Sequence, residues 1–178
     1  MDTVLDRSGV RVRSAAPGRR AVLARAAGIG AVSGLAGAAA TAVSQRLERA
    51  VTGRPASYVA GRTLLLLAGR SPGDDERPAA ATAAMRVGTS VALGALRGVW
   101  RASGLVVVRA TVAQTLTRII VDQTLENATG AGAPPRTWQR GEGVVEVLHA
   151  AVDAIATGLL VEHLVDPVLE SRRGTASH

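Results

Sequence analysis

The interior of this protein has to be built almost without large side chains. The 178 residues include no Phe, one Tyr and two Trp, and Ala, Val and Leu make up most of the 47% that is hydrophobic. Soluble cores normally rely on aromatic side chains for buried area. With almost none available, helices must approach each other closely through small residues, as they do in lipid. A GC-rich coding sequence is a second source of the alanine, since all 21 basic residues are Arg.

The first long apolar stretch lies between Arg25 and Arg46 and carries no charge. It has the length of roughly 20 residues that a membrane span needs. Basic residues precede it, as they do on the cytoplasmic side of a span. Within it, Gly30 and Gly34 form a G-x-x-x-G step, which allows another helix to come close. The stretch is therefore predicted to be a membrane helix packed through its glycines.

The start of the same stretch allows a second interpretation. Arg19 and Arg20 precede a mildly apolar run, and Ala40-Thr41-Ala42 resembles a cleavage site, as in a twin-arginine export signal. Arg25, however, falls near the start of the apolar run, and nothing after residue 42 resembles an exported enzyme that carries a cofactor. We therefore favour a retained helix.

Helical periodicity and Gly/Pro-rich turns divide the rest of the chain. The predicted fold is all-α, a four-helix bundle that crosses a membrane, with a short extra helix between its first two helices. The long helices are expected at about residues 21–51, 79–100, 104–127 and 142–165. They form a bundle domain over residues 19–167, between a flexible basic arm at 1–18 and a tail at 168–178. The short helix falls in the apolar segment from Thr63 to Gly69, which is too short to span.

The middle helices carry a second glycine step and a polar stripe. Gly94 and Gly98 form another G-x-x-x-G step on the second long helix. On the third, Gln114, Arg118 and Asp122 recur at intervals of four residues, which places them on one face of an apolar helix. Lipid rejects charge unless it faces the bundle interior or the membrane interface. The stripe is therefore expected at one of these two locations.

On the last helix four polar residues share one face, at spacings of four, three and four: Glu142, Glu146, His149 and Asp153. Glu-x-x-His is half of the motif that holds carboxylate-bridged metals in bundles, but no second copy with the right spacing is present. His149 and its neighbouring carboxylates would also suit one divalent metal or a proton relay. The preferred interpretation is a buried polar stripe of Glu146, His149 and Asp153. It would pair with Arg109 or Arg118 of the third helix, and solvent exposure is the alternative.

Charge and missing motifs exclude several classes of function. The net charge is +7, but Arg is spread along the chain without interleaved aromatics, which argues against nucleic-acid binding. Membrane lipids are the favoured partners of this charge. The absence of Cys excludes disulfides, thiolate metal sites and Cys nucleophiles. No nucleophile elbow, phosphate loop or dinucleotide fingerprint is present, so no cofactor is predicted and a non-enzymatic role is favoured.

Three parts of the chain resemble helices of one family: residues 31–55, residues 84–98, and Trp138 followed by residues 146–158. They are similar to the YagU-like family of uncharacterised bacterial inner-membrane proteins. The resemblance implies a small helical integral membrane protein with no established activity. His149, and Glu146 in place of an Asp, match polar positions of the family. The chain departs from the family's pattern at Arg86, Val87, Ala150 and Asp153.

Three hypotheses of function follow. The first is a non-enzymatic integral protein of the bacterial cytoplasmic membrane, with buried Arg–carboxylate pairs between the third and fourth long helices. The second is a soluble (cytoplasmic) or peripheral bundle that binds a lipid or apolar ligand between its helices. The third is a metal- or proton-handling membrane protein that uses Glu146, His149 and Asp153. A homo-oligomer is compatible with each, because G-x-x-x-G steps serve contacts between chains as readily as within one.

Overall fold

A computed structural model describes residues 18–73, 75–133, 137 and 141–168. This part of the chain contains five α-helices and no strand: α1 (Arg19–Thr52), α2 (Val59–Leu67), α3 (Ala79–Ala102), α4 (Val107–Thr129) and α5 (Glu142–Leu164). The predicted all-α class is confirmed. The helices number five rather than four when the short helix is counted with the four long ones. The extra helix was expected in the segment from Thr63 to Gly69, and α2 begins earlier, at Val59, and ends at Leu67. The predicted basic arm, the predicted tail beyond Val168 and Trp138 lie outside the described residues.

Glycines in the left-handed backbone region set several helix ends. Gly53 after α1 has φ +69° and Gly130 after α4 has φ +73°, a conformation that is strained for other residues. Gly104, with φ +84°, turns the chain between α3 and α4. The third long helix, expected from about residue 104, begins at Val107, because this turn has to be completed first.

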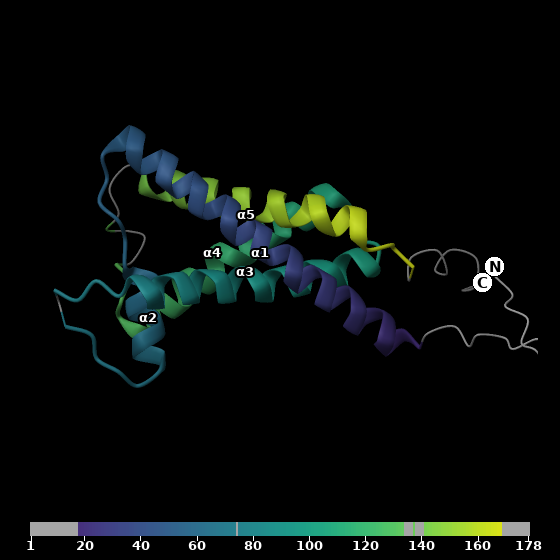
Figure 1. The fold of residues 1–178 in the computed structure, drawn as a ribbon, viewed down its shortest axis with the longest axis horizontal. Coiled ribbons are helices and arrows are strands. Elements are labelled where there is room, and N and C mark those ends of the chain that lie inside the picture. The colour runs from purple at the N-terminus through teal and green to yellow at the C-terminus, as the bar shows by residue number, and fades with distance from the viewer. Residues whose placement is uncertain (1–17, 74, 134–136, 138–140, 169–178) are drawn as a thin grey trace, which may run out of the picture.

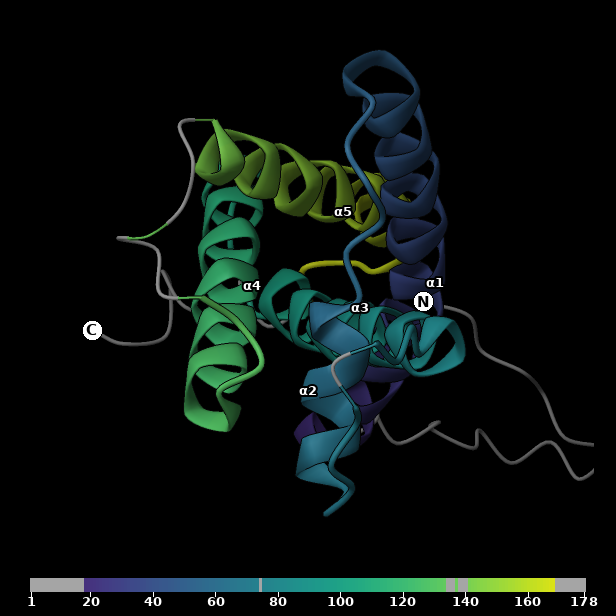
Figure 2. The same cartoon turned by 90° about the vertical axis from the view of Figure 1, so that its left-hand side faces the viewer.

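The four long helices run in alternating directions along the molecule (Figure 1). α1 begins at the end where α5 finishes, and α2 lies at the opposite end. Viewed from the α2 end, α1 and α4 lie on opposite sides, with α3 and α5 between them (Figure 2). α1 packs most extensively on α3 and next on α5, whereas α4 packs mainly on α5. The short helix α2 packs on α3 and α4.

The contact between α1 and α3 is made by backbone against backbone. A Cβ atom built at Gly30 would overlap the carbonyl oxygen of Gly94, and one built at Gly94 would overlap that of Gly30. Gly34 lies against Ser90 in the same way. A Cβ at Gly98 would likewise overlap a carbonyl of α1. The structure thus brings the two G-x-x-x-G steps together. The helices can approach this closely because the glycines at the contact have no side chain.

Polar and apolar side chains are distributed in the reverse of a soluble bundle. The largest fully buried side chains are mostly polar: Arg97, Gln114, Thr63, Thr157, Asp153, Ser33 and Ser90, with Val161 as the aliphatic exception. Large apolar side chains are exposed along the outer faces of the long helices, among them Val32, Leu35, Val43 and Leu47 of α1, Val108, Val112, Leu116 and Ile120 of α4, and Val147, Leu148, Ile155 and Leu159 of α5. Most large apolar side chains therefore lie on the outer faces of the long helices, while the interior holds polar groups together with small apolar residues such as Ala102, Ala110 and Ala154.

Among the described helices, α1, α3 and α5 are long and apolar enough to cross a membrane. With a rise of about 1.5 Å per residue, α3 and α5 each extend for about 35 Å, and a bilayer's hydrocarbon layer is about 30 Å thick. α4 is as long as α5 but does not reach the same mean hydropathy. Its polar stripe is the reason, because Gln114, Arg118 and Asp122 lower the mean of the whole helix.

Candidate functional site

A salt bridge between α4 and α5 lies near the middle of the bundle. Nη1 of Arg118 is 3.2 Å from Oδ1 of Asp153, whose side chain is 1% exposed. The Ser90 hydroxyl of α3 donates to the same carboxylate oxygen at 2.6 Å and accepts from Arg118 Nη1 at 2.8 Å. Each of these residues is about halfway along its helix. Three helices therefore share one charged centre, far from either end of the bundle.

Arg118 is shared between two carboxylates. Its Nε atom is 2.9 Å from Oδ2 of Asp122, one turn further along α4. Gln114, one turn earlier, donates its amide N–H to Oδ2 of Asp153 at 3.4 Å. The predicted stripe on this helix therefore faces the bundle interior. We call Ser90, Gln114, Arg118, Asp122 and Asp153 the central cluster. It contains two carboxylates and one guanidinium, so the charge of one carboxylate is left uncompensated.

A small cavity adjoins the central cluster on the side of α2. Its volume is about 60 Å³, which is room for about two water molecules. All five helices contribute to the lining. The charged residues of the lining are Arg86, Arg118, Asp122, Glu126 and Glu146. A polar space of this size between helices is suited to water and small ions.

The residues of the predicted stripe on α5 lie in different environments. Asp153 belongs to the central cluster, and His149 is buried with Nδ1 3.0 Å from the Ser44 hydroxyl of α1. Glu146 lines the cavity but is exposed, so its assignment to a buried stripe is wrong. The reason is position: Glu146 lies only one turn from the start of α5, where the bundle opens. Glu142 lies at that start, 3.3 Å from Arg54.

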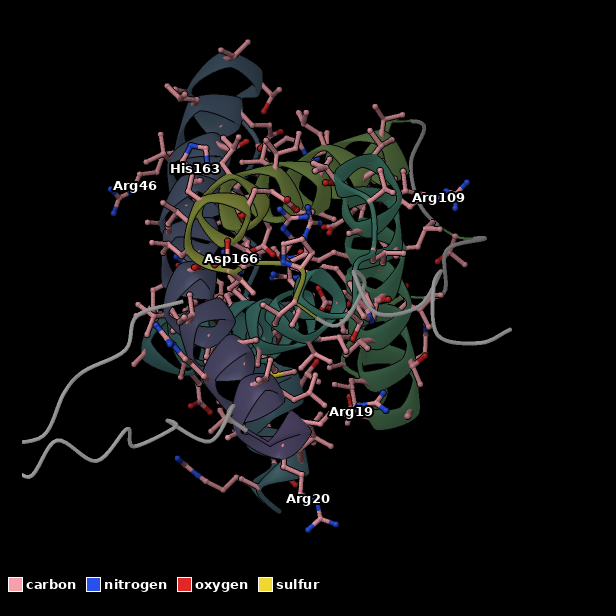
Figure 3. All side chains as sticks on the ribbon, turned by 90° about the vertical axis from the view of Figure 1, so that its right-hand side faces the viewer. Arg19, Arg20, Arg46, Arg109, His163 and Asp166 are labelled. Carbon is pink, nitrogen blue, oxygen red and sulfur yellow. The ribbon has the colours of Figure 1, made fainter. Side chains whose placement is uncertain are left out.

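Arg109 is not part of the site, and its assignment to the buried stripe is also wrong. The side chain is exposed and points outward from α4 (Figure 3). Arg109 and Arg118 are two and a half helical turns apart, so they project from opposite faces of α4. A helical wheel of the sequence contains this information. Of the two candidate arginines, the structure brings only Arg118 to Asp153.

A second group of buried charges, which the sequence analysis did not predict, lies toward the end where α5 finishes. Arg97 of α3 is fully buried, with Nη2 3.7 Å from Glu162 Oε1 and 3.1 Å from Thr111 Oγ1. Arg101 Nε is 2.8 Å from the other oxygen of Glu162. Gly158 makes room for the guanidinium, because a Cβ there would be 2.7 Å from Arg97 Nη2. The sequence did contain a signal for this group, because Arg97 interrupts the apolar stretch of α3.

Glu162→Gln is expected to lower the free energy of unfolding by about 2 kcal/mol, because it removes the carboxylate nearest to the buried Arg97. Glu142→Gln is the matched control. It removes a carboxylate from the same helix, where the pair with Arg54 is about one-third exposed, and should cost less than about 1 kcal/mol. Thermal unfolding in detergent, followed by circular dichroism, compares the two. Equal losses of stability would show that Glu162 does not compensate a buried charge.

Within the described residues, no group of three or more His, Asp or Glu side chains is placed to hold a metal ion. The half-motif of Glu146 and His149 therefore gains no third ligand from a neighbouring helix. The site therefore provides fixed positive and negative charges around a cavity that is large enough for water molecules.

Comparisons with protein-family models, with curated proteins and with solved structures gave no match to this chain. The function of the site therefore has to be inferred from its own geometry.

Proposed function

We propose that the protein is a non-enzymatic integral protein of the bacterial cytoplasmic membrane, in which α1, α3, α4 and α5 all cross the bilayer. The observation that carries this proposal is the polar interior enclosed by an apolar surface. In water, this arrangement would leave rows of large apolar side chains exposed along several helices, which soluble monomers avoid. In lipid, the same arrangement is favourable, because charged groups turn inward and pair while apolar side chains meet the acyl chains.

α4 belongs to the spanning set although its mean hydropathy is low. Four residues on its outer face, Val108, Val112, Leu116 and Ile120, follow one another at intervals of four and are each more than half exposed. Its polar stripe faces the interior instead, where Arg118 meets Asp153. Mean hydropathy averages over both faces of a helix. It therefore underestimates how apolar the outer face is when the polar face is covered by protein. Membrane lipids are thus the partners of this outer surface.

A soluble or peripheral bundle with an apolar ligand between its helices receives less support. The cavity beside the central cluster is small and lined by charged groups, which do not suit an apolar ligand. The apolar hollow of about 300 Å³ lies instead at one end of the bundle, between the start of α1 and the end of α5. Metal or proton handling by Glu146, His149 and Asp153 acting together is also less favoured. Glu146 and His149 both line the cavity, but Asp153 lies in the central cluster, and the described residues contain no group of three His, Asp or Glu side chains placed to hold a metal ion. The resemblance to YagU-like proteins stays a prediction that agrees with a membrane location.

In fractionated cells, the tagged protein is expected to stay in the membrane pellet through washes with high salt and alkaline carbonate, and to be released by detergent. Integral proteins resist these washes because their apolar surface has no favourable place in water. Release by salt or by carbonate would contradict the proposal and would support a peripheral bundle.

The absence of Cys allows the same membranes to test α4 directly, because a single introduced cysteine is the only reactive thiol. Leu116→Cys, on the outer face at mid-helix, should be protected from a water-soluble maleimide until detergent is added. Asn127→Cys, exposed near the end of the same helix, is the control and should react before detergent is added, in membranes made permeable to the reagent. Equal reactivity at the two positions would remove α4 from the spanning set.

A further inference from the structure

The charges around the cavity do not balance. Two guanidinium groups, Arg86 and Arg118, face three carboxylates of the lining, Asp122, Glu126 and Glu146. Arg118 is in addition shared with Asp153, a fourth carboxylate. His149 also lines the cavity, with its ring hydrogen-bonded to Ser44. With the carboxylates ionised, the lining and the central cluster together carry more negative than positive charge.

The arginines at the adjoining surface do not correct this imbalance. Arg54 lies 3.6 Å from Glu48 and 3.3 Å from Glu142, so two further carboxylates accompany it. Arg49, which donates to the backbone carbonyl of Gln45 in its own helix, adds one more positive charge, so the two arginines only balance Glu48 and Glu142 and leave the excess at the cavity unchanged. An excess of negative charge inside a membrane protein is costly unless a positive charge accompanies it or a carboxylate takes up a proton.

A buried hydroxyl of the cavity lining has no partner. Thr41 of α1 is 5% exposed, it lines the cavity, and its Oγ1 makes no hydrogen bond with any described residue. Five other helical threonines, Thr63, Thr82, Thr89, Thr115 and Thr117, each donate to the backbone carbonyl one turn earlier. Thr157 of α5 also has an unpartnered hydroxyl, but it does not line the cavity. Buried polar atoms without a partner in the protein commonly meet water or an ion.

We propose that this cavity binds a small monovalent inorganic cation, which enters from the α2 end and is held by Thr41 Oγ1, by water and by the surrounding carboxylates. The proposal rests on the membrane location proposed above. The cavity volume of about 60 Å³ admits a small ion with a water molecule. A divalent ion fits less well, because it requires several carboxylates that converge on one point, and the described residues contain no such group.

The test uses the full chain purified in detergent, with radioactive Na⁺ binding measured by scintillation proximity in a background of N-methylglucamine chloride. Saturable binding is expected, and Tm should rise with Na⁺ at constant ionic strength because the ion binds only the folded state. Thr41→Val keeps the size of the side chain and removes the oxygen. It should weaken the affinity for Na⁺ by about tenfold, the effect of one lost hydrogen-bonding group.

Two matched controls accompany the variants. Thr117→Val makes the same change on α4, where the hydroxyl donates within its own helix at 2.7 Å and does not line the cavity, and should leave Na⁺ affinity unchanged. Glu146→Gln, at an exposed position that tolerates substitution, should weaken Na⁺ binding, whereas Glu142→Gln should not.

Three results would overturn the proposal: no saturable Na⁺ binding by the wild type, equal affinities for Thr41→Val and Thr117→Val, or a Tm that responds to pH but to no alkali cation. The last result would assign the compensating charge to protons. None of these measurements depends on membrane fractionation, so the cation site and the membrane location can fail separately.

Discussion

Gly30→Ala is expected to destabilise the contact between α1 and α3 by about 3 kcal/mol, the upper end of the range for overpacking a well-packed interior. The added methyl group would overlap the carbonyl oxygen of Gly94 and lie 2.9 Å from the backbone nitrogen of Gly98. Both are backbone atoms, so no side chain can rotate away. The helices would have to separate along their closest contact.

Gly28→Ala is the matched control, because it lies on the same helix and a Cβ there meets nothing within 4 Å. Replacing an unconstrained helical glycine by alanine should leave stability unchanged or raise it by up to about 1 kcal/mol. Gly88→Ala is the corresponding control on α3. Unfolding of detergent-solubilised protein by increasing denaturing detergent ranks the variants. If Gly30→Ala and Gly28→Ala were equally stable, the backbone contact between α1 and α3 would be refuted.

Arg118→Met is expected to reduce the free energy of unfolding by about 3–5 kcal/mol, because it leaves Asp153 buried with no opposite charge. Arg109→Met provides the control on the same helix. That arginine is exposed on the opposite face, so its loss should change stability by less than about 0.5 kcal/mol.

A double variant separates the charge from the packing. Arg118→Met with Asp153→Leu removes both members of the salt bridge and should recover most of the stability lost by Arg118→Met alone, since no buried charge is left between α4 and α5. Asp122, whose side chain is 26% exposed beside the cavity, can be solvated instead. A double variant less stable than Arg118→Met would mean that Arg118 and Asp153 contribute independently of each other.

Local patterns account for the parts of the site that repeat along one helix. Gln114, Arg118 and Asp122 lie four residues apart, and that interval alone places them on one face of α4. The same rule places Arg109 on the opposite face of α4. The predicted stripe was wrong about Arg109 because the rule was not applied to that residue. For α5, spacing correctly groups His149 with Asp153 on one face, but it carries no information about how far along the bundle each residue is covered.

The sequence by itself determined the helices, the glycines that let them approach, and the face of each helix that carries polar groups, because these depend on residues within a few turns of one another. Only the tertiary structure decided that Gly30 meets Gly94, that Arg118 is shared by Asp122 and Asp153, and that Arg97 is buried against Glu162. Such pairs join residues far apart in the chain. Their geometry depends on the positions and rotations of whole helices, which no local pattern specifies.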